Sequence, residues 1–212
     1  PVIFTASPIK GEGKTFVSLN LALTLSSMDK KVVLIGADLR NPQLHKYLNS
    51  DKNQIGLSNY LHDTRTDWRS LIKENVFDNE YFNIIFSGPL IPNPAELLSN
   101  GRFEELLNIL KKEYDYIIVD TAPTILVSDT FLISHLSDLT LYITRADHTE
   151  KKLLTYSLDL KNQGKLKNMA YVINNVGTSQ GYEYNYGYDF GYGDDYRKVT
   201  KKAKWFRILK SV

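Results

Sequence analysis

The sequence has 212 residues, of which 26 are Lys or Arg and 24 are Asp or Glu, giving a formal net charge of +2. This balance predicts no bulk attraction to nucleic acid. The absence of cysteine excludes a disulfide framework, a cysteine-ligated metal and thiol catalysis. The length predicts one domain with a substantial core. No apolar stretch approaches the roughly 18 residues that a membrane-spanning helix needs, and no signal peptide is recognisable.

Apolar runs of strand length alternate with segments of helix length along the chain. The runs lie at residues 2–6, 32–35, 81–86, 116–119, 139–143 and 170–173. Several of them are continuously apolar, which predicts strands covered on both faces. We therefore expect a three-layer α/β fold with a mostly parallel central sheet. Ligands of such sheets bind beyond the carboxyl ends of the strands.

Two segments are expected to form the longer helices. Residues 15–28 predict a helix whose buried stripe consists of Phe16, Leu19, Ala22, Leu23 and Leu25. Residues 94–112 predict a second helix, interrupted near residue 100 by an Asn-Gly pair. Residues 41–80 are the least regular, with a short helix starting near Gly56. We expect this stretch to cap an edge of the sheet or to meet a partner.

The first apolar run is followed by a glycine-rich loop, TASPIKGEGKT, which opens the first predicted helix. Backbone N–H groups of such a loop form an anion site, and Gly11 and Gly13 allow the backbone to approach a phosphate closely. Lys14 would contact the β- and γ-phosphates of ATP, and the Thr15 hydroxyl would ligate Mg²⁺. Pro8 stands where the strict motif has glycine, so the match is partial. The alternative is a glycine-rich turn before a helix.

Asp120 ends the apolar run YIIVD, in the arrangement of a Walker B strand. Its carboxylate would lie beside Mg²⁺, directly or through water. An aspartate after a buried strand is common on its own. Together with the GEGKT loop it indicates an ATP–Mg²⁺ site, and the two motifs place the predicted sheet in the P-loop NTPase fold.

Two further segments separate one family from other P-loop proteins. VVLIGADLRNP, at residues 32–42, resembles the Walker A′ motif of bacterial tyrosine kinases (BY-kinases), the cytoplasmic domains of polysaccharide co-polymerase systems. SGPLIPNPAELL, at residues 87–98, resembles another segment of that family. Asp38 and Arg40 match the second aspartate and the arginine of the family's Asp-x-Asp-x-Arg. The first aspartate, which the family is thought to use as base toward tyrosine, falls at Gly36, so the base cannot be carried over.

The resemblance implies ATP and Mg²⁺ as cofactors and suggests a role for each matching residue. Thr15, Asp38 and Asp120 would hold the metal. Lys14, Asp38 and Asp120 would form the catalytic set. The nucleotide would be bound by Gly11, Glu12, Gly13, Lys14, Thr15, Phe16 and Asn174.

Three polar residues outside these motifs have alternative interpretations. Asn174 matches the family's strand-end asparagine near the adenine, and a turn asparagine is the alternative. Arg40 could reach phosphate or a neighbouring subunit, and a surface charge is the alternative. Asp129 fits a helix N-terminal carboxylate better than a catalytic residue.

The end of the chain differs in composition from the rest. Residues 181–196 read GYEYNYGYDFGYGDDY, a pattern that forms no core, and residues 197–212 mix basic with apolar side chains. We divide the chain into a P-loop kinase domain (1–180), a tyrosine-rich acceptor tail (181–196) and a basic C-terminal segment (197–212). The expected phosphate acceptors are Tyr182, Tyr184, Tyr186, Tyr188, Tyr192 and Tyr196. A self-associating low-complexity tail is the alternative, and the basic segment could meet an anionic membrane, pair with the phosphorylated tail or be a solvated end.

These features predict an ATP-dependent protein-tyrosine kinase that autophosphorylates its own tail between subunits and regulates capsule or exopolysaccharide synthesis and export. The family implies a homo-oligomer, an octameric ring in the full-length protein, at the cytoplasmic face of the bacterial inner membrane. It also implies a membrane-embedded activator, which a missing N-terminal part would supply, and the present chain is expected to be a soluble fragment. A partition-type ATPase, and a nucleotide-binding scaffold without catalysis suggested by Gly36, are the alternatives.

Overall fold

A computed structural model gives the structure of this protein and describes residues 1–176. The predicted acceptor tail (181–196) and the basic segment (197–212) lie outside the described residues. None of the helices within residues 1–176 is both long enough and apolar enough to cross a membrane.

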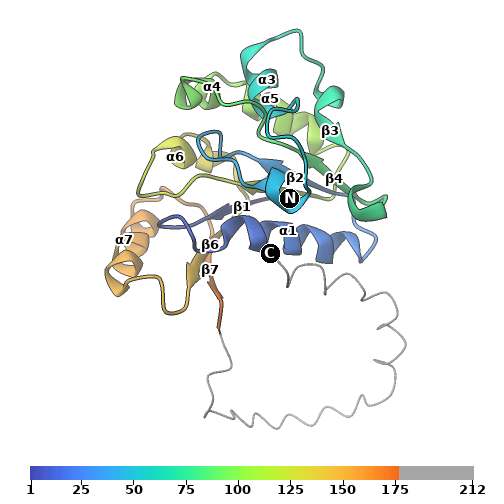
Figure 1. Ribbon diagram of the computed structural model, residues 1–212. Helices are drawn as coiled ribbons and strands as arrows, with labels where there is room; N and C mark the ends of the chain where they lie inside the picture. The colour runs from blue at the N-terminus through green and yellow to red at the C-terminus, as the bar shows by residue number, and fades with distance from the viewer. Residues whose placement is uncertain (177–212) are drawn as a thin grey trace, which may run out of the picture. The chain divides into compact units, whose positions relative to one another are not determined.

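A seven-stranded sheet lies at the centre of the described residues, in the order β3-β4-β2-β5-β1-β6-β7 (Figure 1). The strands are β1 (Val2–Ala6), β2 (Val32–Gly36), β3 (Ile72–Lys73), β4 (Phe82–Ile85), β5 (Tyr116–Asp120), β6 (Leu139–Arg145) and β7 (Met169–Asn174). Neighbouring strands run parallel except β3 and β4, which are antiparallel. The predicted mostly parallel sheet is confirmed, and each apolar run forms one of its strands.

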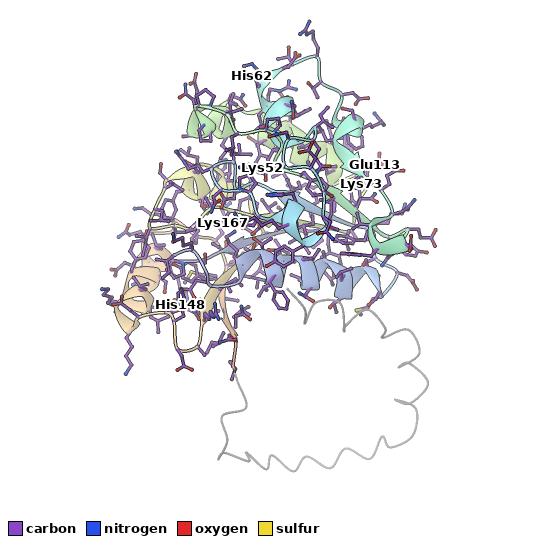
Figure 2. All side chains as sticks on the ribbon, in the orientation of Figure 1. Lys52, His62, Lys73, Glu113, His148 and Lys167 are labelled. Carbon is purple, nitrogen blue, oxygen red and sulfur yellow. The ribbon has the colours of Figure 1, made fainter. Side chains whose placement is uncertain are left out.

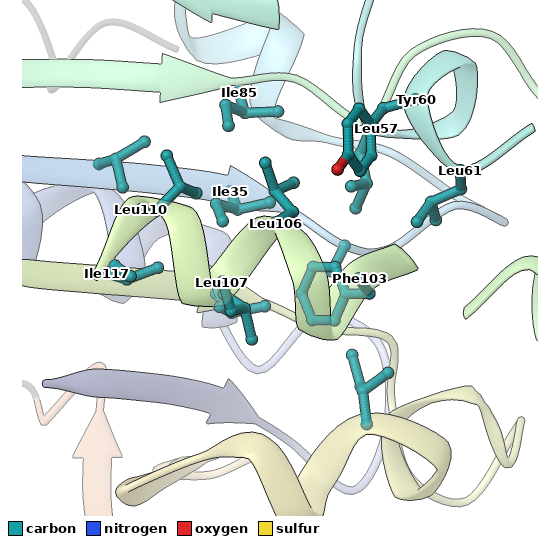
Figure 3. Packing of buried hydrophobic residues seen from close by; sticks show 14 of the residues in the cluster. Ile35, Leu57, Tyr60, Leu61, Ile85, Phe103, Leu106, Leu107, Leu110 and Ile117 are labelled. Carbon is teal, nitrogen blue, oxygen red and sulfur yellow. The ribbon is translucent and has the colours of Figure 1, made fainter. Parts of the chain in front are cut away.

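Helices cover both faces of this sheet (Figure 1). They are α1 (Lys14–Ser26), α2 (Leu44–Tyr47), α3 (Leu57–His62), α4 (Pro94–Ser99), α5 (Arg102–Leu110), α6 (Asp129–Ile133) and α7 (Lys151–Asn162), with 3₁₀ turns η1 (Trp68–Leu71), η2 (Val76–Asp78) and η3 (Ser134–Leu136). Alternate residues of β2 enter two cores, because successive side chains of a strand point to opposite faces. Val33 and Ile35 pack in the core that α5 joins, which Figure 3 shows from close by, whereas Val32 and Leu34 pack in the core that α1 joins. This is the predicted three-layer arrangement.

The buried stripe of α1 differs in part from the prediction. Leu19 and Ala22 are fully buried as expected, but Phe16 is 39% exposed, so its inclusion in the stripe is wrong. Ser18 takes the buried position in that turn, and its hydroxyl lies 2.7 Å from the Thr5 hydroxyl of β1. A small hydrogen-bonded side chain at this point lets the start of the helix lie close to the strand, which a phenylalanine would prevent.

Residues 41–80 complete one edge of the sheet, as expected. Ile72–Lys73 form β3, which pairs with the end of β4. The short helix expected near Gly56 is α3. The expected break near residue 100 lies at Gly101, which separates α4 from α5 with a φ of 85° that glycine adopts readily. The sequence does not predict β3, which has only two residues, or α7, which lacks a continuous apolar stripe.

Candidate nucleotide and metal site

The candidate site lies at the carboxyl ends of three neighbouring strands, β1, β5 and β2. The loop between β1 and α1 carries Gly11 and Gly13, each with a φ of 87° in the left-handed region. Gly13 caps α1, and the Val17 N–H donates to the Gly13 carbonyl oxygen at 2.9 Å. The N–H groups of the residues between them have no partner inside the helix and can bind an anion, as the GEGKT motif predicts.

Asp120 contacts both side chains that the motif connects with phosphate and metal. Its Oδ1 lies 2.5 Å from the Lys14 Nζ, and its Oδ2 accepts a hydrogen bond from the Thr15 Oγ1 at 2.7 Å. Lys14 is 7% exposed and Asp120 is 2% exposed, so solvent and salt screen this ion pair only weakly. The structure therefore brings the predicted phosphate-binding lysine, the predicted metal-binding threonine and the Walker B aspartate into direct contact.

Asp38 follows β2 and lies near the charges of Lys14 and Asp120. The N–H of Ala37, just before it, donates to the Asp120 carbonyl oxygen at 2.8 Å, and the Asp38 Oδ1 accepts from the Asn41 N–H at 2.9 Å. Burial raises the pKa of the Asp38 carboxyl above its ordinary value. The Lys14 charge opposes this rise, and the Asp120 charge adds to it. Asp38 thus lies within electrostatic reach of both partners of the buried ion pair.

The oxygen donors gathered here are the Thr15 hydroxyl and the carboxylates of Asp38 and Asp120. In phosphoryl-transfer sites Mg²⁺ is held by one or two carboxylates together with phosphate oxygens and water. Within residues 1–176, no group of three or more His, Cys, Asp or Glu side chains could hold a metal by itself. The donor set therefore fits Mg²⁺ bound together with a nucleotide, and does not fit a metal held by protein ligands alone.

Residues far along the chain hold the outer side of the glycine-rich loop. Glu12 is 1% exposed, and its Oε2 accepts a hydrogen bond from the Thr149 Oγ1 at 2.6 Å. The Arg145 Nη1 donates to the Gly11 carbonyl oxygen at 3.0 Å. Sequence reasoning missed both Thr149 and Arg145, which lie 137 and 134 residues from their partners. No motif marks either of them.

Asn174, at the end of β7, also contacts the loop. Its Nδ2 donates to the Glu12 carbonyl oxygen at 2.8 Å, and a Cβ at Gly13 would lie only 2.0 Å from the same atom. Glycine at position 13 is therefore needed for this contact. The predicted contacts of Asn174 with adenine and of Phe16 with the nucleotide stay predictions.

Arg40 forms a two-pronged ion pair with Asp129 at the start of α6. Its Nε donates to the Asp129 Oδ2 at 2.7 Å, and its Nη2 donates to Oδ1 at 2.9 Å. Asp129 is buried in the first turn of α6, as the interpretation as a helix N-terminal carboxylate expects. Arg40 is therefore an exposed charge, as its alternative interpretation expects, and it is paired with Asp129. A contact of Arg40 with phosphate or with another subunit stays a prediction.

Gly36 ends β2 and is paired with Asp120 in the register of the sheet. A Cβ added at this position would lie 2.7 Å from the Ser87 Oγ and 3.2 Å from the Ser87 backbone nitrogen. The hydroxyl can turn away by rotation about one bond, and both atoms can donate to a carboxylate. Gly36 stands where the BY-kinase motif has its first aspartate. Ser87, beside it, could donate hydrogen bonds to an aspartate at this position.

Comparison with known proteins finds relatives that are named as tyrosine-protein kinases. Residues 2–146 match the family described as AAA domain. The tyrosine-protein kinase Ptk of Acinetobacter johnsonii is 35% identical over 182 residues, which is 85% of this chain and 24% of Ptk. The tyrosine-protein kinase YwqD of Bacillus subtilis is 30% identical over 184 residues, which is 87% of this chain and 76% of YwqD. The chain thus spans about a quarter of one relative and about three quarters of the other.

The described fold is also similar to a solved kinase structure. The kinase domain of the Escherichia coli tyrosine kinase ETK aligns with a TM-score of 0.78 and 31% identity. The alignment covers 89% of this chain and 72% of that one. The similarity therefore extends over most of this chain.

Replacing Asp38 by asparagine should raise the free energy of unfolding, measured by urea denaturation without nucleotide at about pH 7. Burial raises the folded-state pKa of this carboxyl, so between the unfolded and folded pKa values the folded protein binds more protons than the unfolded chain. Stability therefore falls as the pH rises through this window. The gain in the variant should be present near pH 7 and disappear toward about pH 4.

The matched control is Asp159→Asn, at an exposed position on α7, which should leave the unfolding free energy unchanged. Asparagine at position 38 keeps an oxygen that can accept from the Asn41 N–H, so the comparison isolates the charge. A loss of stability in Asp38→Asn near pH 7 would contradict the account, because the attraction of Lys14 would then outweigh the cost of burial.

Proposed function

This chain belongs to the bacterial tyrosine-kinase family, and we propose that it transfers the γ-phosphoryl group of ATP to tyrosines of its own tail. The observation that carries the proposal is the buried contact of Asp120 with Lys14 and Thr15, with Asp38 alongside. A phosphate-binding lysine, a hydroxyl and two carboxylates at one edge of the sheet form the set that phosphoryl transfer uses.

Binding of ATP would change the partners of these side chains. Lys14 would leave Asp120 for the β- and γ-phosphates, and the loop N–H groups would hold the remaining phosphate oxygens. Asp120 and Thr15 would then be free to hold Mg²⁺, with Asp38 beside them. When bound, the metal neutralises the charge that develops on the phosphates. The glycine-rich loop, which Thr149 and Arg145 hold in place, would fix the position of the phosphates. Positioning supplies much of the catalysis in phosphoryl transfer.

The base is the part of this machinery that departs from the family. Position 36 has no side chain to accept the tyrosine proton, and a tyrosine hydroxyl, with a pKa of about 10, benefits from such help. Asp38 is the substitute that we propose, because its pKa is raised and it lies beside the Lys14–Asp120 pair. A general base typically contributes about 10²–10⁴-fold, so we expect a slow kinase rather than an inactive one.

The proposed acceptors are the tail tyrosines between residues 182 and 196. A fifteen-residue extended segment spans about 50 Å, which is enough to reach the site of a neighbouring subunit. We propose transfer between subunits of a homo-oligomer, an activator embedded in the membrane, and a role at the cytoplasmic face of the inner membrane in capsule or exopolysaccharide export. The resemblance of the motifs supports these finer points.

Incubating the purified chain with ATP and Mg²⁺ and mapping phosphotyrosine by mass spectrometry tests the proposal. Phosphate should appear on tyrosines between residues 182 and 196, and Lys14→Met should reduce it by about 10²-fold or more, because the lysine stabilises the transferred charge. Lys30→Met removes an exposed lysine outside the site and should have no effect. Release of ADP with an unmodified tail would instead indicate an ATPase, and bound ATP with neither product would indicate a scaffold.

Replacing Gly36 by aspartate should raise the initial rate of tail phosphorylation by about tenfold to a hundredfold, because it restores a base beside Asp120. The rate is measured on Tyr192 by mass spectrometry after short incubation. Gly36→Asn is the matched control, since it has nearly the same shape and the same contact with Ser87 but no base. Equal rates in the two variants would show that the missing carboxylate does not limit the reaction.

A further inference from the structure

A small pocket lies beside Gly36, where β4 ends. Its polar lining comes from His45, Lys52, Gln54 and Ser87, and the rest of its lining is apolar or glycine. No acidic side chain is among the residues that line it. The Ser87 hydroxyl is the atom that a Cβ at position 36 would meet at 2.7 Å. The pocket therefore adjoins the position where this chain lacks a side chain.

One residue that lines this pocket, Gln54, has a buried side-chain atom without a hydrogen-bond partner. Within residues 1–176, only two buried side-chain nitrogen or oxygen atoms lack a hydrogen-bond partner, and the Gln54 Nε2 is one of them. The pocket has a volume of about 10 Å³, which is room for about one water-sized atom. A buried amide N–H₂ without an acceptor is costly, so the pocket is suited to one oxygen that accepts a hydrogen bond.

The charges around the pocket favour an anion. Lys52 lines it directly and is exposed, so its side chain can turn to meet a ligand. The pKa of His45 is lowered first by burial and then by the positive charges of Lys46 and Lys52, against the opposing charge of Asp51. The effect of the two lysines on the His45 pKa is therefore larger than the effect of Asp51. A carboxylate oxygen is the ligand that matches both the size and the charge.

We propose that this pocket binds the side-chain carboxylate of an acidic residue next to the acceptor tyrosine, so that the kinase selects tyrosines with an acidic neighbour. The inference rests on the proposed kinase function and adds its substrate preference. One carboxylate oxygen would enter the pocket and accept from Gln54 and Ser87, and Lys52 would pair with the charge.

The distance along the sheet edge from the pocket to the Lys14–Asp120 pair suits a peptide with a tyrosine and an adjacent acidic residue. Ser87 follows β4, Gly36 ends β2 and Asp120 ends β5, and these three strands are consecutive neighbours. Strands lie about 4.8 Å apart, so the pocket is roughly 10 Å from the Lys14–Asp120 pair. Successive side chains of an extended peptide point to opposite sides, so a tyrosine hydroxyl and the carboxylate of an adjacent residue end roughly this far apart, with the hydroxyl at the site and the carboxylate in the pocket.

The tail contains tyrosines with an acidic residue immediately beside them and tyrosines without one. Tyr182 and Tyr184 flank Glu183, Tyr188 precedes Asp189, and Tyr196 follows Asp195, as the sequence GYEYNYGYDFGYGDDY gives. Tyr192 lies between two glycines and Tyr186 between asparagine and glycine, so neither has an acid immediately beside it. The proposal therefore predicts faster modification at the first group than at the second.

The test is the initial rate of phosphorylation at Tyr188 divided by that at Tyr192, measured by mass spectrometry on the full 212-residue chain. Asp189→Asn should lower this ratio by about five- to tenfold, because asparagine keeps an oxygen that can accept a hydrogen bond but loses the charge that pairs with Lys52. Gln54→Glu places a negative charge in the pocket and should lower the ratio in the same way. Because the ratio is internal to one chain, partial loss of folding or of general activity does not change it.

Lys52→Met should lower the ratio in the chain with Asp189 and have no further effect once Asp189→Asn is present. Lys73→Met is the control, since it removes an exposed lysine of β3 that does not line the pocket; Figure 2 labels both lysines. A ratio unchanged by Asp189→Asn or by the pocket variants, with phosphotyrosine still formed, would overturn this inference alone. Absence of phosphotyrosine on every tyrosine would instead contradict the proposed function.

Discussion

The carboxylate of Asp120 is the centre on which the site depends. It accepts from the Lys14 ammonium at 2.5 Å and from the Thr15 hydroxyl at 2.7 Å, in a place where water hardly reaches. Removing one partner of a buried ion pair leaves an uncompensated charge, which is strongly destabilising. The parallel register of β1, β5 and β2 and the turn before α1 bring these groups together from distant parts of the chain. In the proposed mechanism, the same interaction holds Lys14 in place before nucleotide and metal bind.

Much of the fold and of the central site could be predicted from the sequence, because the signals are local. Continuous apolar runs mark strands that are buried on both faces, and these gave six of the seven strands of the described sheet. The GEGKT loop, Asp38 and Asp120 follow such runs directly, so their positions at the carboxyl edge follow from the topology. The helix break at Gly101 could also be predicted, because the Asn-Gly pair that causes it is local in the sequence.

The parts that could not be predicted depend on contacts between distant segments. Thr149 holds Glu12 across 137 residues, and nothing around it distinguishes it from a residue at a helix start. The spacing predicts a buried Phe16, but Ser18 is the buried residue because the start of α1 lies close to β1. The serine beside Gly36 lies after a different strand, β4, so the sequence shows that position 36 lacks a carboxylate but does not show which residue lies next to it.

A crystal structure of the chain with a non-hydrolysable ATP analogue and Mg²⁺ tests the central claim most directly. The quantity to measure is the distance between the Lys14 Nζ and the Asp120 carboxylate, which is 2.5 Å here. The account predicts that this distance grows beyond the roughly 4 Å of an ion pair, with Lys14 on the β- and γ-phosphates and Asp120 at the metal. A bound nucleotide with the Lys14–Asp120 contact intact would contradict it.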